Sequence, residues 1–585
     1  VYQGTLRAPR SFYDAYGLDP DFVTVVDCYP DLLWVVESDG GAEIRVVDAK
    51  ATDTARLAHR IQVGLYALIL DHVLAEAGHS GRFSPTRKGG VWLYGQSEPE
   101  WFDLSRIVPP LETFLRQDLV RVLSGPTEDA FWHLSRRCEW CDWYPSCRAE
   151  ADTTSNVSLV PALSSFAKRH LAEADPPVTT LADLGELLAR PDAAAALAGC
   201  ASLEGRERSL ALQVEALVDG VQRPTGASSV AMPMAEHVMV VLTLQDEPLK
   251  GSLYGYSIRR AKGADLFGKG LETVTRVAPD GDEATIAQLR RDLVTDLMAV
   301  LGPVDEWNRD HDVWKDQKTV QVYVFDAYER DLLVEALLAA ATDPVVAEEA
   351  LSLLFWFQRP ELVDADDHPA GEVFFPVVVI SQVVRALVAL PVTVTYRLAD
   401  VSAALAPSTY AADYRPSDLF AFHLSNRMKS DTIFSVWEEG KTERLEWIEK
   451  ELNRRTWAAT SVISGLRERL DGSGALFAWP PKFFLPPGLN FRHPVLSRLA
   501  FVGRYEAVLG YLDIRTKRGA AAEERIANGD SVRLVALGDG RFRIDGVAED
   551  LDVEKSSFFE WILTVDSEPG RRARLAFDDF AYRNR

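Results

Sequence analysis

Side chains that could hold a divalent cation lie close together near the beginning of the chain. Asp31 precedes an apolar run, and Asp48 and Lys50 lie at the end of the next one. Carboxylate oxygens are the ligands that hard divalent cations such as Mg²⁺ and Mn²⁺ prefer. If the chain brings the two carboxylates together beside the ammonium group, these three residues form a metal site.

Two strands must position these residues. The runs 32–37 and 42–47 are apolar and rich in β-branched residues, and the short loop between them contains glycine, which predicts a β-hairpin. In the register that pairs the two runs from the loop outward, Asp31 lies opposite Asp48 at the open end, with Cβ atoms roughly 5 Å apart. Because strand side chains alternate, Lys50 lies on the same face as Asp48.

A helix should follow the hairpin. Residues 55–77 contain no proline and carry apolar residues at helical spacing. Gln62 and Tyr66 are four residues apart, on one stripe with Ile69 and Val73. A polar amide on an apolar face needs a hydrogen-bonding partner. We therefore expect Gln62 to find its partner at the open end of the hairpin.

The order Pro30-Asp31, Asp48-Ala49-Lys50 and Gln62-x-x-x-Tyr66 resembles the PD-(D/E)xK superfamily, specifically its RecB-like exonuclease branch. The resemblance implies a restriction-endonuclease-like domain in which Asp31 and Asp48 hold Mg²⁺ or Mn²⁺. It also implies that Lys50 stabilises the attacking hydroxide or the developing phosphorane charge, and that Gln62 and Tyr66 orient the site. Phosphodiester hydrolysis needs an activated water and neutralised charge, which this set would provide.

Simpler interpretations stay open. An Asp-x-Lys at a strand end and a lone glutamine are each more often structural than catalytic, and only their combination is specific. Asp21 also follows a proline, but it lies outside the hairpin register. The family usually has a further His or Glu ligand on a helix upstream of the hairpin, and no such residue is evident before Asp31. Because the chain begins at Val1 rather than Met, we expect an N-terminal portion to supply it.

Three of the five cysteines fall in one short run rich in aromatic residues. Cys138, Cys141 and Cys147 have the spacing Cys-x2-Cys-x5-Cys, which predicts a metal site in a reducing compartment. After a RecB-like core, this spacing resembles the iron-sulfur staple of AddB-type and related nucleases, which implies a [4Fe-4S] cluster with a fourth, upstream cysteine. Cys28 lies too close to Asp31 to be a distant ligand. A Zn²⁺ site or a lost cluster is the alternative, and we interpret the fifth cysteine, Cys200, as a buried small residue.

Composition limits the classes of protein. At 585 residues the chain is long enough for about three to five domains. It lacks an apolar run of membrane-spanning length and a signal-peptide pattern, which favours a cytoplasmic protein. The net charge of −24 opposes general nucleic-acid binding, yet a large acidic enzyme can line one channel with basic residues. Basic clusters occur at 136–137, 168–170, 259–262 and 515–518, and each alone is more often a solvated face.

We expect the nuclease domain and its cysteine staple to span residues 1–151, with a strand pair within 91–104 and a helix at 110–123. Residues 152–232 have a helical, alanine-rich pattern. They weakly resemble the helix-hairpin-helix linkers of RecB-like fusion proteins, and a plain helical spacer is the alternative.

Residues 233–410 alternate strands and helices, as in an α/β domain, and resemble the RNase H-like module found beside RecB-like nucleases. Active members of that module carry acidic residues in the first strand, where this chain has Leu242-Thr243-Leu244-Gln245. Asp246 and Glu247 come one step later, so we expect an inactive domain that is structural or guides substrate. Asp326, at the end of a later strand, is interpreted as a capping or turn residue.

The remaining chain has two parts. Residues 411–527 are mainly helical around a proline-rich interruption, and residues 528–585 contain two strand-turn-strand patterns, which predicts a helical stalk and a small β-barrel. Together they resemble the stalk and barrel of superfamily 1 helicases with N-terminal nucleases. Since no Walker A or Walker B sequence occurs, we expect the motor beyond Arg585 or in a partner protein.

The sequence therefore predicts an α/β multidomain deoxyribonuclease that depends on Mg²⁺ or Mn²⁺. Its expected substrate is single-stranded, flapped or branched DNA, in DNA repair or anti-phage defence. A threaded strand would use stacking aromatics and a basic groove; Trp34, Trp140 and Trp143 are candidates, although each is more often a core residue. Two other classes stay open: an inactive DNA-binding scaffold for a helicase, and an assembly subunit of a helicase or defence complex.

Overall fold

The structure is a computed structural model, and it divides the chain into two compact units. The first comprises residues 1–131, 248–251 and 519–559, and the second comprises residues 132–247, 252–518 and 560–585. Across the described ranges, no helix has both the length and the apolar character needed to cross a membrane. The structure describes residues 4–38, 41–50, 52, 55–79, 82–85, 88–126, 131–200, 202–248, 251–263, 273–358, 374–407, 414–477, 479–486, 494–519, 533–538, 541–545, 562–565 and 568–574.

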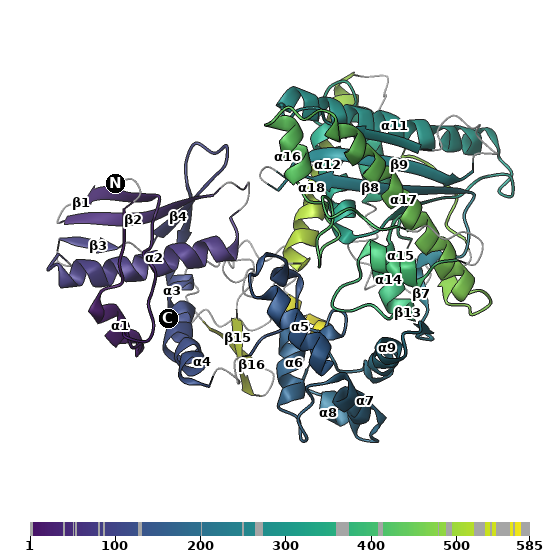
Figure 1. The fold of residues 1–585 in the computed structure, drawn as a ribbon. Helices are drawn as coiled ribbons and strands as arrows, with labels where there is room; N and C mark the ends of the chain where they lie inside the picture. The colour runs from purple at the N-terminus through teal and green to yellow at the C-terminus, as the bar shows by residue number, and fades with distance from the viewer. Residues whose placement is uncertain are drawn as a thin grey trace. The chain divides into compact units, whose positions relative to one another are not determined.

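The first unit is a five-stranded sheet with the long helix α2 along one face (Figure 1). The sheet order is β1-β2-β4-β5, and β3 also pairs with β2. The predicted hairpin and the strand pair after it are confirmed. The helix predicted at 110–123 is continuous but contains a π-helical segment, Phe114–Leu119. In chain order the elements are α1 (Arg10–Tyr16), β1 (Leu32–Ser38), β2 (Gly41–Lys50), α2 (Leu57–Glu76), β3 (Phe83–Pro85), β4 (Lys88–Leu93), β5 (Glu100–Asp103), α3 (Val108–Thr113) and α4 (Val120–Ser124).

The packing of β2 determines where its polar residues lie. Ile44 and Val46 belong to the core that β2 shares with Val63 and Leu70 of α2. Side chains on one face of a strand recur every second residue. Asp48 therefore continues the buried face of β2 beyond its apolar residues, toward α2.

The second unit begins with a helical layer, as its alanine-rich pattern predicts. Its helices are α5 (Tyr144–Thr154), α6 (Ser165–Ala172), α7 (Leu181–Ala189), α8 (Ala193–Leu197) and α9 (Glu207–Asp219). Side-chain caps fix two helix starts: Ser164 accepts from the Ala167 N–H at 3.0 Å, and Thr180 accepts from the Asp183 N–H at 3.1 Å. The apolar faces of these helices share one core.

A mixed sheet forms the centre of the second unit, which confirms the predicted α/β pattern. Its order is β10-β9-β8-β11-β12; β10, β9 and β8 are antiparallel neighbours, whereas β8, β11 and β12 are parallel. The elements of this region are β6 (Arg223–Pro224), β7 (Ser229–Pro233), β8 (Val238–Asp246), β9 (Leu253–Lys262), β10 (Thr273–Val277), α11 (Glu283–Asp310), β11 (Val320–Val324), α12 (Ala327–Ala340), α13 (Ala347–Phe357), β12 (Val377–Val379), α14 (Ile380–Leu387), β13 (Val388–Ala389) and α15 (Leu398–Ala404).

Helices cover both faces of this sheet. Val240 and Leu242 of β8 pack with α11, α12 and α13. Met239 and Val241 pack with α14, α15 and the later helix α17 (Arg444–Arg469) (Figure 1). The sheet thus lies between two helical layers, each sealed by alternate residues of the same strands. The remaining elements are mainly helical, as predicted: α16 (Asp431–Trp437), α17 (Arg444–Arg469), β14 (Leu476–Phe477) and α18 (Pro494–Gly519).

The tail contains the two predicted hairpins but not the predicted barrel. β15 (Arg533–Gly538) pairs with β16 (Arg541–Asp545), and β17 (Ile562–Val565) pairs with β18 (Glu568–Arg574). In the described part of the tail each hairpin is a separate two-stranded sheet, and the two belong to different compact units. A closed small barrel is therefore wrong for these residues, because no ladder joins one hairpin to the other.

Candidate metal centre

Asp31 and Asp48 come together at the open end of the hairpin. The observed register pairs Leu32 with Val47, as predicted. Asp31 Oδ2 accepts a hydrogen bond from the Ala49 backbone N–H at 2.7 Å, which holds its carboxylate against β2. Asp48 is only 3% exposed, because it extends the buried face of that strand.

The charge of Asp48 depends on its burial and on its neighbours. Burial raises the pKa of Asp48 above its ordinary value, Lys50 lowers it, and direct contact with the Asp31 carboxyl raises it again. Two carboxylates in contact repel each other unless a proton or a cation lies between them. The pair is therefore arranged to attract positive charge.

Lys50 is held beside this pair by helix α2. Its Nζ forms an ion pair with Asp48 Oδ2 and donates to Gln62 Oε1 at 2.9 Å. Gln62 Nε2 in turn donates to Tyr66 Oη at 2.7 Å. Gln62 and Tyr66 lie one helical turn apart, so their side chains align along the helix. The structure thus brings together all five residues that the sequence singles out in this part of the chain.

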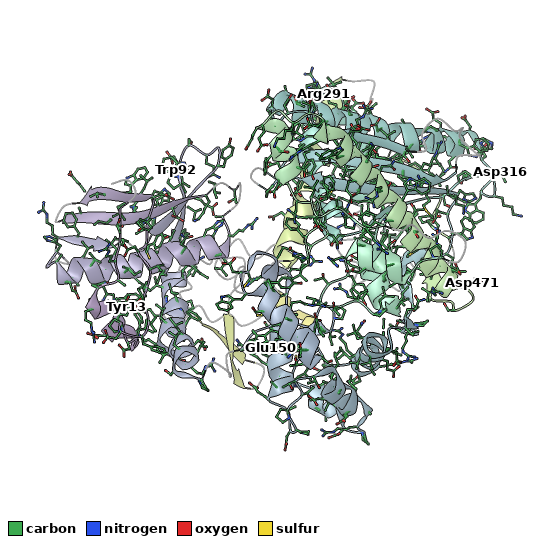
Figure 2. All side chains as sticks on the ribbon, in the orientation of Figure 1. Tyr13, Trp92, Glu150, Arg291, Asp316 and Asp471 are labelled. Atoms are coloured by element: carbon green, nitrogen blue, oxygen red, sulfur yellow. The ribbon has the colours of Figure 1, made fainter. Side chains whose placement is uncertain are left out.

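Close approach of neighbouring elements fixes α2 in place. A Cβ on Gly64 would lie 2.9 Å from Ile107 Cγ2, just before α3, and a Cβ on Gly89 of β4 would lie 2.6 Å from Val63 Cγ1. Glycine at these two positions lets α2 pack directly against both elements. Trp92, labelled in Figure 2, pairs with Ala49 and marks the end of β4 next to the site.

An ion pair that the sequence did not single out lies on the same face. Arg60 of α2 donates to Glu100 Oε1 at 2.8 Å, with its guanidinium 5.6 Å from the Phe102 ring centre. Glu100 pairs with Val91, which pairs with Asp48, so Asp48 and Glu100 face the same side of the sheet. The register of the predicted strand pair could have indicated that Glu100 lies on the same face of the sheet as Asp48.

The fit of this site to a metal rests on its charge. Within the residues that the structure describes, no group of three or more His, Cys, Asp or Glu side chains converges as a metal site. Asp31 and Asp48 provide two carboxylates, and a hard divalent cation fills its remaining positions with water and substrate oxygens. Because Asp48 is buried against a second carboxyl, a bound cation would remove the repulsion that the two groups experience without it.

The three clustered cysteines lie in the second unit, next to its helical layer. Cys138 lies in a 3₁₀ turn and Cys147 in α5, and both are free thiols, as is Cys141. Burial raises the pKa of the Cys147 thiol, and Cys138 and Cys141 raise it further. Among the described residues, these three thiols do not converge as a group that could hold a metal ion. Cys200 is fully buried, as predicted.

Loops of the second unit anchor the cysteine turn. Glu139 accepts hydrogen bonds from the backbone N–H groups of His423 at 2.8 Å and Leu424 at 2.5 Å. Farther along, Arg148 of α5 donates to Thr393 Oγ1 at 3.1 Å. The cysteine turn is thus fastened to the α/β part of its own unit.

Two members of the basic clusters are not solvated. Lys168 donates to the Trp132 carbonyl at 2.6 Å and lies 3.8 Å from the Trp132 ring centre, and burial lowers its pKa to about 8. Arg260 is 5% exposed. Both side chains are buried within the second unit and do not form part of an exposed basic surface.

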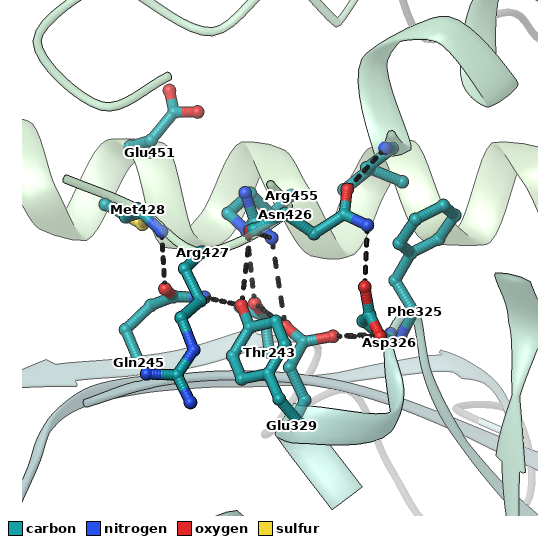
Figure 3. Close-up of polar contacts among 12 residues, drawn as sticks. Thr243, Gln245, Phe325, Asp326, Glu329, Asn426, Arg427, Met428, Glu451 and Arg455 are labelled. Carbon is teal, nitrogen blue, oxygen red and sulfur yellow. Dashed lines mark hydrogen bonds and ion pairs between the residues drawn. The ribbon is translucent and has the colours of Figure 1, made fainter. Parts of the chain in front are cut away.

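A second polar cluster lies at the carboxyl ends of β8 and β11 (Figure 3). Thr243 Oγ1 donates to Glu329 Oε1 at 2.6 Å. Arg455 of α17 donates to Thr243 Oγ1 at 3.3 Å and to the Asn426 carbonyl at 2.7 Å, and it lies 4.0 Å from Glu329. A guanidinium cation therefore occupies the centre of this cluster.

The segment 424–428 covers this end of the sheet. Asn426 Nδ2 donates to Asp326 Oδ2 at 2.7 Å, and the Met428 N–H donates to Gln245 Oε1 at 2.8 Å (Figure 3). Asp326 also caps α12, by accepting from the next backbone N–H at 2.7 Å, which confirms its predicted capping role. Asp326 and Gln245 thus take hydrogen-bond partners from this segment of the chain.

No known family model, no curated protein and no solved structure matches the chain.

Proposed function

We propose that the first unit is a nuclease domain that hydrolyses DNA phosphodiester bonds with Mg²⁺ or Mn²⁺. One observation carries the proposal: Asp31, Asp48, Lys50, Gln62 and Tyr66 form one continuous series of contacts at the end of a hairpin. Two carboxylates, an ammonium group and a helix that orients it are the set expected of the PD-(D/E)xK superfamily.

Each residue then has a distinct task. Asp31 and Asp48 would hold the cation, which when bound activates water and withdraws charge from the phosphate. Lys50 would neutralise charge on the phosphoryl oxygens as they become more negative. Gln62 and Tyr66 are positioning residues, because their hydrogen bonds restrict the ammonium group of Lys50 to one place beside the carboxylates.

The proposed substrate is single-stranded or branched DNA, and the proposed partner is a superfamily 1 helicase motor in the same polypeptide or in another protein. Trp34 and Trp143 are 42% and 73% exposed and offer ring surface for stacking on bases. The side chain of Trp140 lies outside the described residues.

We also propose that residues 233–410 form an RNase H-like domain without activity. The sheet, with three antiparallel strands followed by two parallel ones, supports this proposal. Thr243 and Gln245 stand in its first strand where active members carry acids. The guanidinium of Arg455 lies beside Glu329, where it neutralises a carboxylate that could otherwise attract a metal.

The nuclease is tested with end-labelled single-stranded DNA and Mn²⁺ or Mg²⁺. We expect Asp48→Ala to abolish cleavage and Lys50→Ala to slow it about 10²-fold to 10³-fold, because each removes charge stabilisation from the reaction. Asp71→Ala and Lys88→Ala, which change exposed residues of the same unit, should cleave like the wild type. DNA binding without cleavage in the wild type would favour the alternative of an inactive scaffold.

A [4Fe-4S] cluster on Cys138, Cys141 and Cys147 is also proposed, with a fourth ligand that the described residues do not identify. Protein purified without oxygen should be brown, absorb near about 400 nm and contain iron, as expected of iron bound by thiolates. Cys141→Ser should lose colour and iron, whereas Cys200→Ser should keep both. A colourless wild type with bound zinc would assign the site to Zn²⁺.

A further inference from the structure

Two exposed tryptophans lie close to three lysines in the second unit. Trp314 is 70% exposed and Trp479 is 50% exposed. The loop after α11 is marked in Figure 2 by Asp316, at the edge of the unit. We call this surface the aromatic-basic strip, and it consists of His237, Lys262, Trp307, His311, Trp314, Lys318, Trp479 and Lys482.

The rings of the strip are held in place by their neighbours. His311 stacks on Trp307 with ring centres 4.2 Å apart and planes 12° apart, and His237 lies 4.8 Å from Trp479. Lys482 Nζ is 4.3 Å from the ring centre of Trp314. A ring held this way loses little freedom when a planar ligand stacks on it.

Three lysines of the strip lie close enough to His237 to act on its charge. None of Lys262, Lys318 and Lys482 forms an ion pair with a carboxylate of the described residues. Burial lowers the pKa of His237, and these three lysines lower it further. Glu236, the carboxylate that acts in the opposite direction on His237, is itself bound to Arg467. Three lysines thus act together on His237, on a protein with a net charge of −24.

A cavity of about 400 Å³ adjoins the strip at Lys482. Its lining includes the rings of Phe355, Trp356, Phe374 and Phe484. Walls of aromatic side chains suit a flat, partly apolar group such as a nucleobase. Lys482 belongs to both features, so one strand could contact the strip and place a base in the cavity.

We propose that the aromatic-basic strip is a binding surface for single-stranded nucleic acid. Phosphates would lie among Lys262, Lys318 and Lys482, and bases would stack on Trp314 and Trp479. Single strands expose both groups together, and stacking on aromatic side chains with a basic track is the usual means of binding them without sequence preference. The proposal goes beyond the nuclease function and does not depend on the metal site, since all of these residues lie in the second unit.

Binding of a fluorescein-labelled oligothymidylate to the full chain, followed by anisotropy in EDTA, tests the proposal. We expect Trp314→Ala and Trp479→Ala each to weaken binding about tenfold. Lys482→Gln should weaken binding and reduce the slope of log affinity against log salt by about one. Trp447→Ala and Lys450→Gln, exposed residues of α17 in the same unit, are the matched controls and should bind like the wild type. Thermal melting confirms that each variant folds.

Three outcomes decide the result. Weaker binding in the strip variants alone supports the proposal, and Asp71→Ala, which changes an exposed residue of the first unit, should bind as tightly as the wild type even if the nuclease proposal fails. Equal affinity of strip variants and wild type would overturn it. Polyglutamate that competes as well as unlabelled oligonucleotide would overturn it too, because the surface would then recognise acidic protein segments.

Discussion

The Asp48→Asn variant should be more stable than the wild type without metal and inactive with it. Asparagine keeps the shape of the side chain and removes a charge that is only 3% exposed. The ion pair with Lys50 favours that charge, but burial and the Asp31 carboxyl outweigh it, since the pKa of Asp48 is raised overall. Because the pKa of Asp48 is raised in the folded protein, its contribution to stability is present at low pH and is lost as the pH rises through that folded value. At pH values above the folded pKa of Asp48, we expect the free energy of unfolding of the variant to exceed that of the wild type by about 1 kcal/mol, because an unfavourable buried charge is absent.

A divalent metal ion should make the wild type more stable than Asp48→Asn. A ligand that binds only the folded state stabilises it by about 2.7 kcal/mol at a hundred times its dissociation constant, so Mn²⁺ should raise the melting temperature of the wild type. The variant lacks one of the two carboxylates and should respond little. Differential scanning fluorimetry at pH 6 and pH 8, with and without Mn²⁺, measures both effects. Asp71→Asn is the control, and a metal response retained by Asp48→Asn would rule out Asp48 as a ligand.

The hairpin site could be foreseen because its geometry is local. The short loop of the hairpin fixes the register of its two strands, and this register places Asp31 beside Asp48 without any contribution from the rest of the chain. Gln62 is likewise close in sequence, and its position on an apolar helical stripe required a nearby partner, which proved to be Lys50. The capping role of Asp326 followed from its place between a strand and a helix.

Contacts between distant segments could not be foreseen. The Glu139 side chain binds backbone groups at 423 and 424, and no periodicity in either segment indicates this. The prediction for the tail failed because it assumed a long-range pairing. Both hairpins were predicted from local turns, but a barrel needs pairing between hairpins, which turn residues do not specify. Local pattern therefore determined pairs of strands and single helices, whereas tertiary pairing determined the rest.

Arg455 is the clearest case of such a long-range contact, and its replacement should have the largest effect on stability. Arg455→Met keeps the length and apolar stem of the side chain but leaves Glu329, which is 1% exposed, without its cation. Glu329 would keep hydrogen bonds from Thr243 and from two backbone N–H groups at 3.0 and 3.1 Å. Leaving one partner of a buried ion pair alone costs about 3 to 5 kcal/mol of stability. We therefore expect the free energy of unfolding of the second unit to fall by about 4 kcal/mol.

The pH dependence distinguishes this cause from lost packing. Burial already raises the pKa of Glu329, and Arg455 lowers it, so the variant's folded pKa should rise further. Its stability should therefore be closest to that of the wild type at low pH and fall as the pH rises through the folded pKa of Glu329. Chemical denaturation across pH measures this, with Arg469→Met at the exposed end of α17 as control.

The double variant Arg455→Met/Glu329→Gln should recover most of the lost stability, because it removes the unpaired charge. A loss that is equal at every pH and that the double variant does not relieve would instead assign Arg455 a packing role, and the internal cation at the end of β8 would not be what holds this edge of the sheet together.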